Sequence, residues 1–536
     1  MLGTLYYLPG KPGQIFKVTH FQERTFTMSM SSHATAHIFV PRSQHYKGPF
    51  GRMFRELPPW TPPNPDTAEA DIRTFAAANM TETAGQDDLD NHNLPAGYTY
   101  FGQFIDHDIT FDPTSSLQRR NDPDKLHNFR TPRLDLDCLY GEGPDDEPFM
   151  YDKKRGGMML IGQVHELDAD GNVTGLTNEP DLPRNVQGIA LIGDKRNDEN
   201  VIVSQFQLAM LRLHNRVYGQ LMGQDPDDAT AVFAIDRDKF REAQRIVRWF
   251  YQWVVWNDFV KRLVKDAIWN DVLVKEDGQL VYRGRFYNWT YQPFIPVEFA
   301  VSAYRFGHSL IRPGYQVNLN TDAGLGFGVE LPIFDPAAAG NQDLSGFRFF
   351  PSRHTVQWDW FFKMASSIEG TFPQPARRID PKLSSAVQSI PEGPNAPNPL
   401  AVLNLLRSWR MEMPRGSDVA IAMGFAPLSI GDAHEDILWH YILKEASQMP
   451  AANAGRMLGN VGGTIVAEVF GGLLAGDPLG YVRNAADWSP GDEPVINALL
   501  PDGPENDNWE VADLIRASGA PVDNNDVERT IANGKN

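Results

Sequence analysis

The segment Gly102-Gln-Phe-Ile-Asp-His-Asp108 holds several groups capable of acid–base or ligand chemistry within seven residues. If the segment is helical, Gln103 and His107 are four residues apart and share one face. Asp106 and Asp108 then project to either side of that face. Imidazole exchanges protons near neutral pH and also binds metals. On its own, the segment is compatible with a metal site, an acid–base pair or a solvated helix end.

The segment Gly193-Asp-Lys-Arg-Asn-Asp-Glu199 combines basic and acidic residues just before an apolar stretch. Arg196 and Glu199 are three residues apart and face the same way if the segment is helical. Spacing alone favours a surface ion pair at a helix N-terminus, and a functional role is the second interpretation.

The segment Tyr304-Arg-Phe-Gly-His308 places a histidine in an otherwise apolar helix. Such a histidine is more often a buried structural residue than a ligand. Two neighbouring residues favour the ligand interpretation. Gly307 has no side chain and would let a flat cofactor approach the backbone. Arg305 shares a face with His308 and could meet an anionic group.

The segment Leu403-Asn-Leu-Leu-Arg407 places Asn404 and Arg407 on one helical face. An amide can accept the second ring proton of a histidine ligand and so fix the orientation of the ring.

Each segment is a weak signal alone, but their order is specific. Together they resemble the animal haem peroxidases of the peroxidase–cyclooxygenase superfamily, the family of myeloperoxidase and lactoperoxidase. The motifs extend over residues 102–407. The lack of disulfides and of a propeptide favours the bacterial members of the superfamily.

The resemblance implies a role for each of the central residues. His308 would be the proximal ligand of haem iron, and Asn404 would take its second ring proton. His107 would be the distal base that moves a proton of hydrogen peroxide. Arg196 would stabilise the negative charge that develops during the reaction. Gln103 would lie in the same distal pocket.

The resemblance also implies how haem b is held. Asp106 and Glu199 match the carboxylates that form ester links to haem in mammalian members. Arg305 and Arg407 would pair with the haem propionates through parallel hydrogen bonds. Asn200 stands where one mammalian member has a methionine, so no sulfonium link is expected.

A calcium site is the third implication of the resemblance. Its ligands would be Asp108, Thr131, the carbonyl of Arg133, Asp135 and Asp137. Oxygen ligands, three of them carboxylates, suit a hard cation. Because Asp108 is adjacent to His107, the ion would hold the distal helix in place. The alternative is an acidic surface loop.

The expected function is therefore that of a peroxidase. It would reduce hydrogen peroxide, oxidise halide, thiocyanate or small phenols, and serve in the response to oxidative stress. One alternative is a fatty-acid dioxygenase of the same superfamily, in which a tyrosine lies three residues before the proximal histidine. Arg305 occupies that position, and Tyr304 is expected to point away from a lipid slot. Another alternative is an adhesion protein, but Arg-Gly-Asp and Lys-Gly-Asp triplets are absent.

Composition limits the other partners. The chain has 536 residues and a formal charge of −19, which disfavours nucleic acid and anionic membranes. It has a single cysteine, Cys138, so no intramolecular disulfide can form. No apolar run is long enough to span a membrane, and no signal peptide is recognisable. We therefore expect a cytoplasmic protein or one secreted by a non-classical route.

The periodicity of apolar residues predicts one large, mainly α-helical domain with long irregular connections and little strand. Residues 1–30 are expected to form an N-terminal arm, which is either an ordinary part of the protein or a stretch ahead of a native start near Met28 or Met30, and residues 31–536 are expected to form the domain. Residues 48–66 are expected to be extended, and residues 120–182 to be a long looped region. Helices are expected at residues 96–112, 201–223, 236–266, 296–312, 355–372, 398–410 and 455–475.

Overall fold

The computed structural model of the protein describes nine stretches of the chain. They are residues 48–82, 89–111, 127–167, 173–318, 330–335, 342–351, 354–364, 373–390 and 399–522. All of them belong to one compact unit, Pro41–Asn536. The expected N-terminal arm lies outside the described residues.

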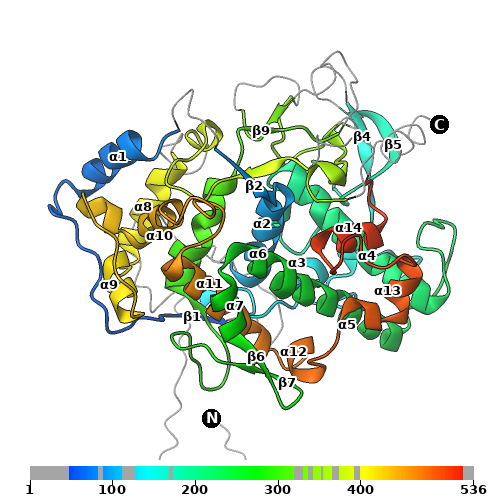
Figure 1. Cartoon of the computed structure of the whole chain (residues 1–536). Helices are drawn as coiled ribbons and strands as arrows, with labels where there is room; N and C mark the ends of the chain where they lie inside the picture. Colours follow the sequence, from blue (N-terminus) through cyan, green and yellow to red (C-terminus); the bar gives the residue numbers. More distant parts are fainter. Residues whose placement is uncertain are drawn as a thin grey trace, which may run out of the picture. The chain divides into compact units, whose positions relative to one another are not determined.

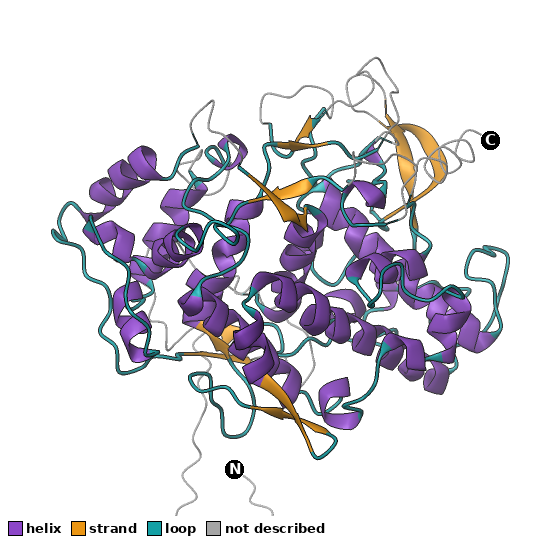
Figure 2. Cartoon of the chain, in the orientation of Figure 1, coloured by secondary structure: helices purple, strands orange, loops and turns teal. Residues whose placement is uncertain are grey.

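Helices make up most of the regular structure, as the sequence predicts (Figures 1 and 2). The α-helices are α1 (Ala68–Asn79), α2 (Gly97–Ile109), α3 (Asp137–Tyr140), α4 (Val201–Met222), α5 (Arg237–Val254), α6 (Lys261–Leu263), α7 (Asp266–Val272), α8 (Leu400–Arg410), α9 (Gly416–Ala422), α10 (Leu438–Ser447), α11 (Asn460–Gly476), α12 (Tyr481–Asn484), α13 (Pro494–Leu499) and α14 (Val511–Ser518).

The strands are short and form small separate sheets. They are β1 (Gly48–Gly51), β2 (Asp90–Pro95), β3 (His127–Asn128), β4 (Gly162–Leu167), β5 (Val173–Asp181), β6 (Leu273–Glu276), β7 (Gln279–Tyr282), β8 (Ile295–Pro296), β9 (Gly314–Tyr315), β10 (Leu331–Pro332) and β11 (Pro375–Arg377). Among the described residues, the sheets have the orders β3-β1-β8, β10-β9, β11-β2, β4-β5 and β6-β7.

Helix α4 is defined by its ends. The side chain of Asn200 accepts a hydrogen bond from the backbone N–H of Val203, which satisfies one of the free donors of the first turn. Gly223 closes the helix at φ 67°, a left-handed conformation that glycine adopts without a steric penalty. The helix is buried along most of its length, and it packs against α2, α5 and α14.

Helix α5 continues through a π-helical segment, Val255–Val260, into α6. The segment carries Asp258, a buried carboxylate that accepts hydrogen bonds from three parts of the chain. Its donors are the hydroxyl of Tyr98 on α2, at 2.8 and 2.9 Å, the guanidinium of Arg262, and the backbone N–H of Val511 on α14, at 2.9 Å. Asp258 therefore ties α2 to the last helix described.

The segment that carries His308 is helical, as predicted, but it is not a regular α-helix. It begins with a π turn, Glu298–Ser302, and continues as a 3₁₀ helix, Ala303–Leu310. The buried Glu298 accepts hydrogen bonds from the backbone N–H groups of Met53 and Phe54, both at 3.1 Å. These bonds attach the extended N-terminal segment to the base of the His308 helix.

Two expectations about secondary structure are wrong. The region 120–182 contains the hairpin β4–β5, two antiparallel strands of six and nine residues. Within residues 355–372, the described part has only a 3₁₀ turn, Trp358–Trp360. Here Trp358, Trp360, Phe361 and Phe362 are all buried, so the apolar run reflects a core cluster instead of one face of a helix.

Candidate functional site

One cavity of about 330 Å³ collects most of the predicted site residues. Its walls come from α2, from the start of α4 and the 3₁₀ helix before it, and from the His308 segment and α8. The predicted residues that line it are Gln103, Asp106, His107, Arg196, Glu199, Arg305, His308 and Arg407. Asn404 lies behind His308, and the remaining predicted residues form a separate cluster.

His107 presents one ring nitrogen to this cavity. Its Nδ1 lies 2.7 Å from Oδ1 of Asn197, and Nδ2 of Asn197 donates to Oε1 of Gln207 at 2.8 Å. In this arrangement the amide oxygen of Asn197 faces the imidazole and its nitrogen faces Gln207. Nδ1–H of His107 therefore donates to Asn197, which leaves the Nε2 lone pair as the basic site. Burial, and then the charge of Arg196, lower the pKa of His107 to about 4, so the ring is neutral at pH 7.

The sequence did not single out Asn197 or Gln207. Asn197 lies inside the motif that contains Arg196, directly after it, and Gln207 lies on the buried face of α4. The only sign of Asn197 in the sequence is an amide inside a charged motif. Spacing alone cannot pair that amide with a histidine 90 residues earlier.

Arg196 is held at the edge of the cavity. Its Nη2 donates to Asp194 at 2.8 Å and to the carbonyls of His107 and Thr110 at 3.2 and 2.5 Å. Burial would raise the pKa of Asp194, but Arg196 and Arg130 outweigh it and hold that pKa well below its usual range. An ionised Asp194 thus orients the guanidinium beside the distal histidine.

Glu199 pairs with the distal helix. Its Oε2 accepts from Nε2 of Gln103 at 2.8 Å, and Oε1 of Gln103 accepts from Nδ2 of Asn200 at 3.1 Å. The surface ion pair between Arg196 and Glu199 that spacing alone favours is therefore wrong, because Arg196 pairs with Asp194 instead. The segment forms only a 3₁₀ turn, Lys195–Asp198, and Glu199 follows it at the edge of the cavity.

His308 is oriented by Asn404, as the sequence predicts. The Nδ2 atom of Asn404 lies 2.7 Å from Nδ1 of His308. A half-turn of the Asn404 amide puts its oxygen in the same place, where it accepts Nδ1–H and leaves Nε2 free to bind a metal. Burial, and then the charges of Arg305 and Arg407, lower the pKa of His308 to about 3.

The surroundings of His308 suit a flat, anionic cofactor. A Cβ added to Gly307 would meet no atom within 4 Å, so the backbone there faces open space. Arg305 and Arg407 line the cavity near His308 and supply two positive charges. A neutral imidazole can bind haem iron, and guanidinium groups can bind the haem propionates. The glycine leaves room for the flat ring.

Tyr304 does not point away from this cavity, which corrects the expectation from sequence. It lines the cavity, and its hydroxyl donates to the carbonyl of Gly102 on α2 at 3.0 Å. The expectation considered the His308 segment alone, whereas the cavity is also bounded by α2, which the Tyr304 side chain reaches through its hydroxyl. Arg305, three residues before His308, also lines the cavity.

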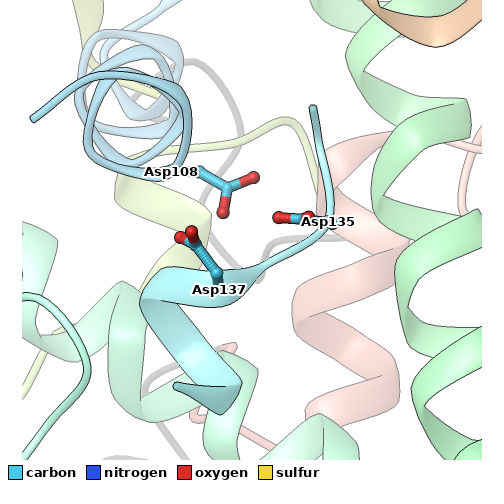
Figure 3. A group of neighbouring side chains, drawn as sticks. All are labelled: Asp108, Asp135 and Asp137. Atoms are coloured by element: carbon cyan, nitrogen blue, oxygen red, sulfur yellow. The ribbon is translucent and has the colours of Figure 1, made fainter. Parts of the chain in front are cut away.

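A second cluster joins the C-terminal end of α2 to the start of α3. Asp108, Asp135 and Asp137 place carboxylate oxygens within 4.8 Å of one another, and Figure 3 shows the three side chains converging. The Oδ1 atoms of Asp108 and Asp135 are buried and accept no hydrogen bond. Burial raises the pKa of Asp108, and the charges of Asp137 and Asp135 raise it further. Burial also raises the pKa of Asp137 to about 7, although Arg130 opposes it.

These carboxylates fit a divalent cation because each would be stabilised by a positive charge between them. Thr131 joins the cluster by donating to Oδ2 of Asp135 at 2.7 Å. Arg133 lies on the same loop between Thr131 and Asp135. The cluster is thus a candidate calcium site, and the helix that carries it also carries His107.

The comparisons with known proteins agree with this geometry. The family model "Animal haem peroxidase" matches residues 116–415, which is more than half of the chain. The match includes Arg196, His308 and Asn404 but begins after His107. Thyroid peroxidase from Mus musculus is 26% identical over 212 residues, or 37% of this chain and 21% of that protein. The rat protein is 25% identical over the same length. The chain thus spans about a fifth of these relatives.

Solved structures show the same fold. Peroxidase A from Dictyostelium discoideum superposes with a TM-score of 0.55 at 14% identity, covering 90% of this chain and 94% of that one. A fatty acid alpha-dioxygenase from Oryza sativa gives 0.53 at 15% identity, covering 80% and 78%. The enzyme from Arabidopsis thaliana gives 0.52 at 14%, covering 90% and 77%.

The fold and the cavity define a mainly α-helical protein with two cavity histidines on separate elements. The chain belongs to the animal haem peroxidase family, whose cofactor is haem. Within the described residues, no helix combines the length and the apolar character needed to cross a membrane.

Proposed function

We propose that the protein is a haem peroxidase that reduces hydrogen peroxide and oxidises halide, thiocyanate or small phenols. One observation carries the proposal. His107 is neutral, buried and fixed by Asn197 in the tautomer whose free nitrogen faces the cavity that also contains His308. A base in that state can accept a proton from a peroxide bound between the two histidines.

The residues of the chain divide the work as follows. Nε2 of His107 takes a proton from one peroxide oxygen and returns it to the other, which leaves as water. Arg196 stabilises negative charge on the departing oxygen, because Asp194 holds its guanidinium at the cavity edge. Two electrons from the donor and two protons complete the reduction of one hydrogen peroxide to two waters. Removal of peroxide in this way would serve in the response to oxidative stress.

Haem, when bound, supplies the iron at which peroxide is reduced. His308 would hold the iron through Nε2, with Asn404 on its other nitrogen. Arg305 and Arg407 would bind the propionates. Asp106 and Glu199 line the same cavity and would form the ester links.

Calcium forms the second part of the proposal. Asp108, Asp135 and Asp137 would bind the ion with Thr131 and the carbonyl of Arg133. The ion would neutralise three crowded carboxylates and so hold the end of α2. This action is structural and affects catalysis only through the position of His107.

The test uses purified, haem-loaded protein, hydrogen peroxide and a phenolic dye. His107→Ala should slow dye oxidation by about 10²–10⁴-fold, the usual contribution of a general acid–base residue. The control is His92→Ala, since His92 is exposed on β2 and lies outside the cavity. Haem-loaded wild-type protein that fails to oxidise phenol, iodide or thiocyanate with peroxide would contradict the proposal.

A fatty-acid dioxygenase remains the second candidate, because Tyr304 lines the cavity and two structural neighbours are fatty acid alpha-dioxygenases. The peroxidase is favoured because Arg305, which cannot form a tyrosyl radical, stands three residues before His308. Oxygen uptake on adding linoleate to the haem-loaded protein decides between them. We expect none; uptake that Tyr304→Phe abolishes would establish the dioxygenase.

A further inference from the structure

A second cavity, separate from the haem site, is rich in arginine. It has a volume of about 870 Å³ and lies between α4, the end of α14 and the loop that follows α4. Four arginines line it, namely Arg155, Arg212, Arg216 and Arg516, with Asp227 as the one acidic lining residue among those described. In a chain with a net charge of −19, this concentration of positive charge is unusual.

Two of the four arginines are already neutralised. Arg155 forms an ion pair with Asp152 at 2.8 Å. Arg516 forms ion pairs with Glu505 at 3.1 Å and with Asp513 at 2.9 Å. Their charges are therefore compensated inside the protein.

Arg212 and Arg216 have no such partner. They are four residues apart on α4 and share a face, where two like charges repel. Arg216 donates to the carbonyl of Ala517 at 3.0 Å, and within the described part of the chain it has no carboxylate within 4 Å. Arg212 has neither a hydrogen bond nor an ion pair to any described residue. Burial lowers the pKa of Arg212, and Asp227 offsets only part of that effect.

The two guanidiniums converge on one point. A Cβ added to Gly519, which ends α14 at φ 67°, would lie 2.7 Å from Nη1 of Arg216 and 3.5 Å from Nη2 of Arg212. Both groups therefore point at the C-terminal end of the same helix and into the same cavity. The negative end of the α14 dipole favours a cation there, but it is equivalent to about half an elementary charge and cannot neutralise two guanidiniums.

We propose that this cavity binds a small molecule through an oxyanion group, a phosphate or a carboxylate, held by Arg212 and Arg216. A guanidinium presents parallel N–H donors that match the oxygens of either group. Leu500, Ala520 and Val522 line the same cavity and would contact the apolar part of such a ligand. The ligand would supply the negative charge that Asp227 alone does not balance against the two guanidiniums.

The site is independent of the haem chemistry. Arg212 follows Asn200, a haem-cavity residue, by twelve positions on α4, or about 18 Å along the helix axis. No described residue lines both cavities. Binding here is therefore separable from peroxide reduction.

The experiment titrates haem-loaded, full-length protein with inorganic phosphate and, separately, with succinate, at constant ionic strength set by NaCl. Isothermal calorimetry measures binding, and the unfolding temperature measures the linked stabilisation. We expect saturable binding of at least one of the two anions; which one binds identifies the oxyanion. Absence of saturable binding of both anions would overturn the proposal.

Variants test the residues. Arg212→Gln should weaken binding about tenfold to a hundredfold, the usual effect of losing a charge-assisted hydrogen-bond donor. The control is Arg241→Gln, an arginine on α5 whose side chain is 74% exposed, which should bind as wild type does. Dye oxidation should be unchanged in both variants. Unchanged affinity in Arg212→Gln would overturn the proposal. If Arg212→Gln does not fold, the affinity of Arg212→Lys, which keeps the charge but loses the paired donors, is compared with that of the wild type instead.

Discussion

Replacement of Asn197 by leucine tests the most specific part of the proposed mechanism. Leucine has nearly the same size but cannot accept the Nδ1–H of His107, which Asn197 accepts at 2.7 Å. The imidazole is buried, so its N–H finds no water in exchange. The variant therefore removes the force that selects the tautomer while leaving the base in place.

The size of the effect follows from the cost of the lost bond. A buried donor left without an acceptor costs about 1–3 kcal/mol. The tautomer with Nδ1 protonated becomes less favourable by that amount relative to the one with Nε2 protonated. Because 1.4 kcal/mol corresponds to a factor of about ten, the ratio of the reactive tautomer to the other falls by roughly 5- to 150-fold. The reaction with peroxide should slow by up to that factor, less than in His107→Ala.

Stopped-flow absorption of the haem band measures this rate directly. Samples are compared at equal haem content, so a change in folding does not enter the result. Asn215→Leu is the matched control, because Asn215 is also a buried amide but lies on α4 and, among the described residues, bonds only to the backbone of Met159. It should lose stability and keep the rate. A haem-loaded Asn197→Leu variant that reacts within twofold of wild type would refute the role of Asn197.

Four other results are expected. His308→Ala should lose the haem absorption band, and a normal spectrum would show that another residue binds the iron. Asp108→Asn should not bind calcium when binding is measured by calorimetry. A chelator should lower the unfolding temperature of the wild type but not that of Asp108→Asn. After treatment with peroxide, peptides containing Asp106 or Glu199 should carry the mass of haem, and complete extraction of haem into acidified solvent would contradict the ester links. Burial lowers the pKa of His214 to about 4, so the unfolded state binds a proton first on acidification; His214 should contribute about 3 kcal/mol to the loss of stability between pH 6.5 and 4, and His214→Gln should lose less than the wild type by about that amount.

The residues that line the cavity between His107 and His308 could be proposed from the sequence because their motifs are local and their chemistry is distinctive. His107, His308 and Asn404 were found from short segments, and the contact between Asn404 and His308 was expected from their types. Helices α4 and α5 were predictable from apolar spacing, with Gly223 marking the end of α4.

The errors have physical causes that a single sequence hides. Tyr304 was misplaced because the sequence does not show that α2 packs against its segment and accepts the Tyr304 hydroxyl. Asn197 was missed because an asparagine in a charged motif has no periodic signal. Arg212 and Arg216 looked like ordinary polar residues of an amphipathic helix, and only the fold brings the end of α14 to them.

The hydrogen bonds of Asp258 have a consequence for how the protein is made. This carboxylate joins Tyr98, early in α2, to the backbone N–H of Val511 at the start of α14. More than 400 residues separate the two, so the bond cannot form during synthesis until the residues of α14 have left the ribosome. Since α2 carries His107, the contact that fixes this helix forms only after α14 has been made, and haem is expected to enter a chain already folded through α14.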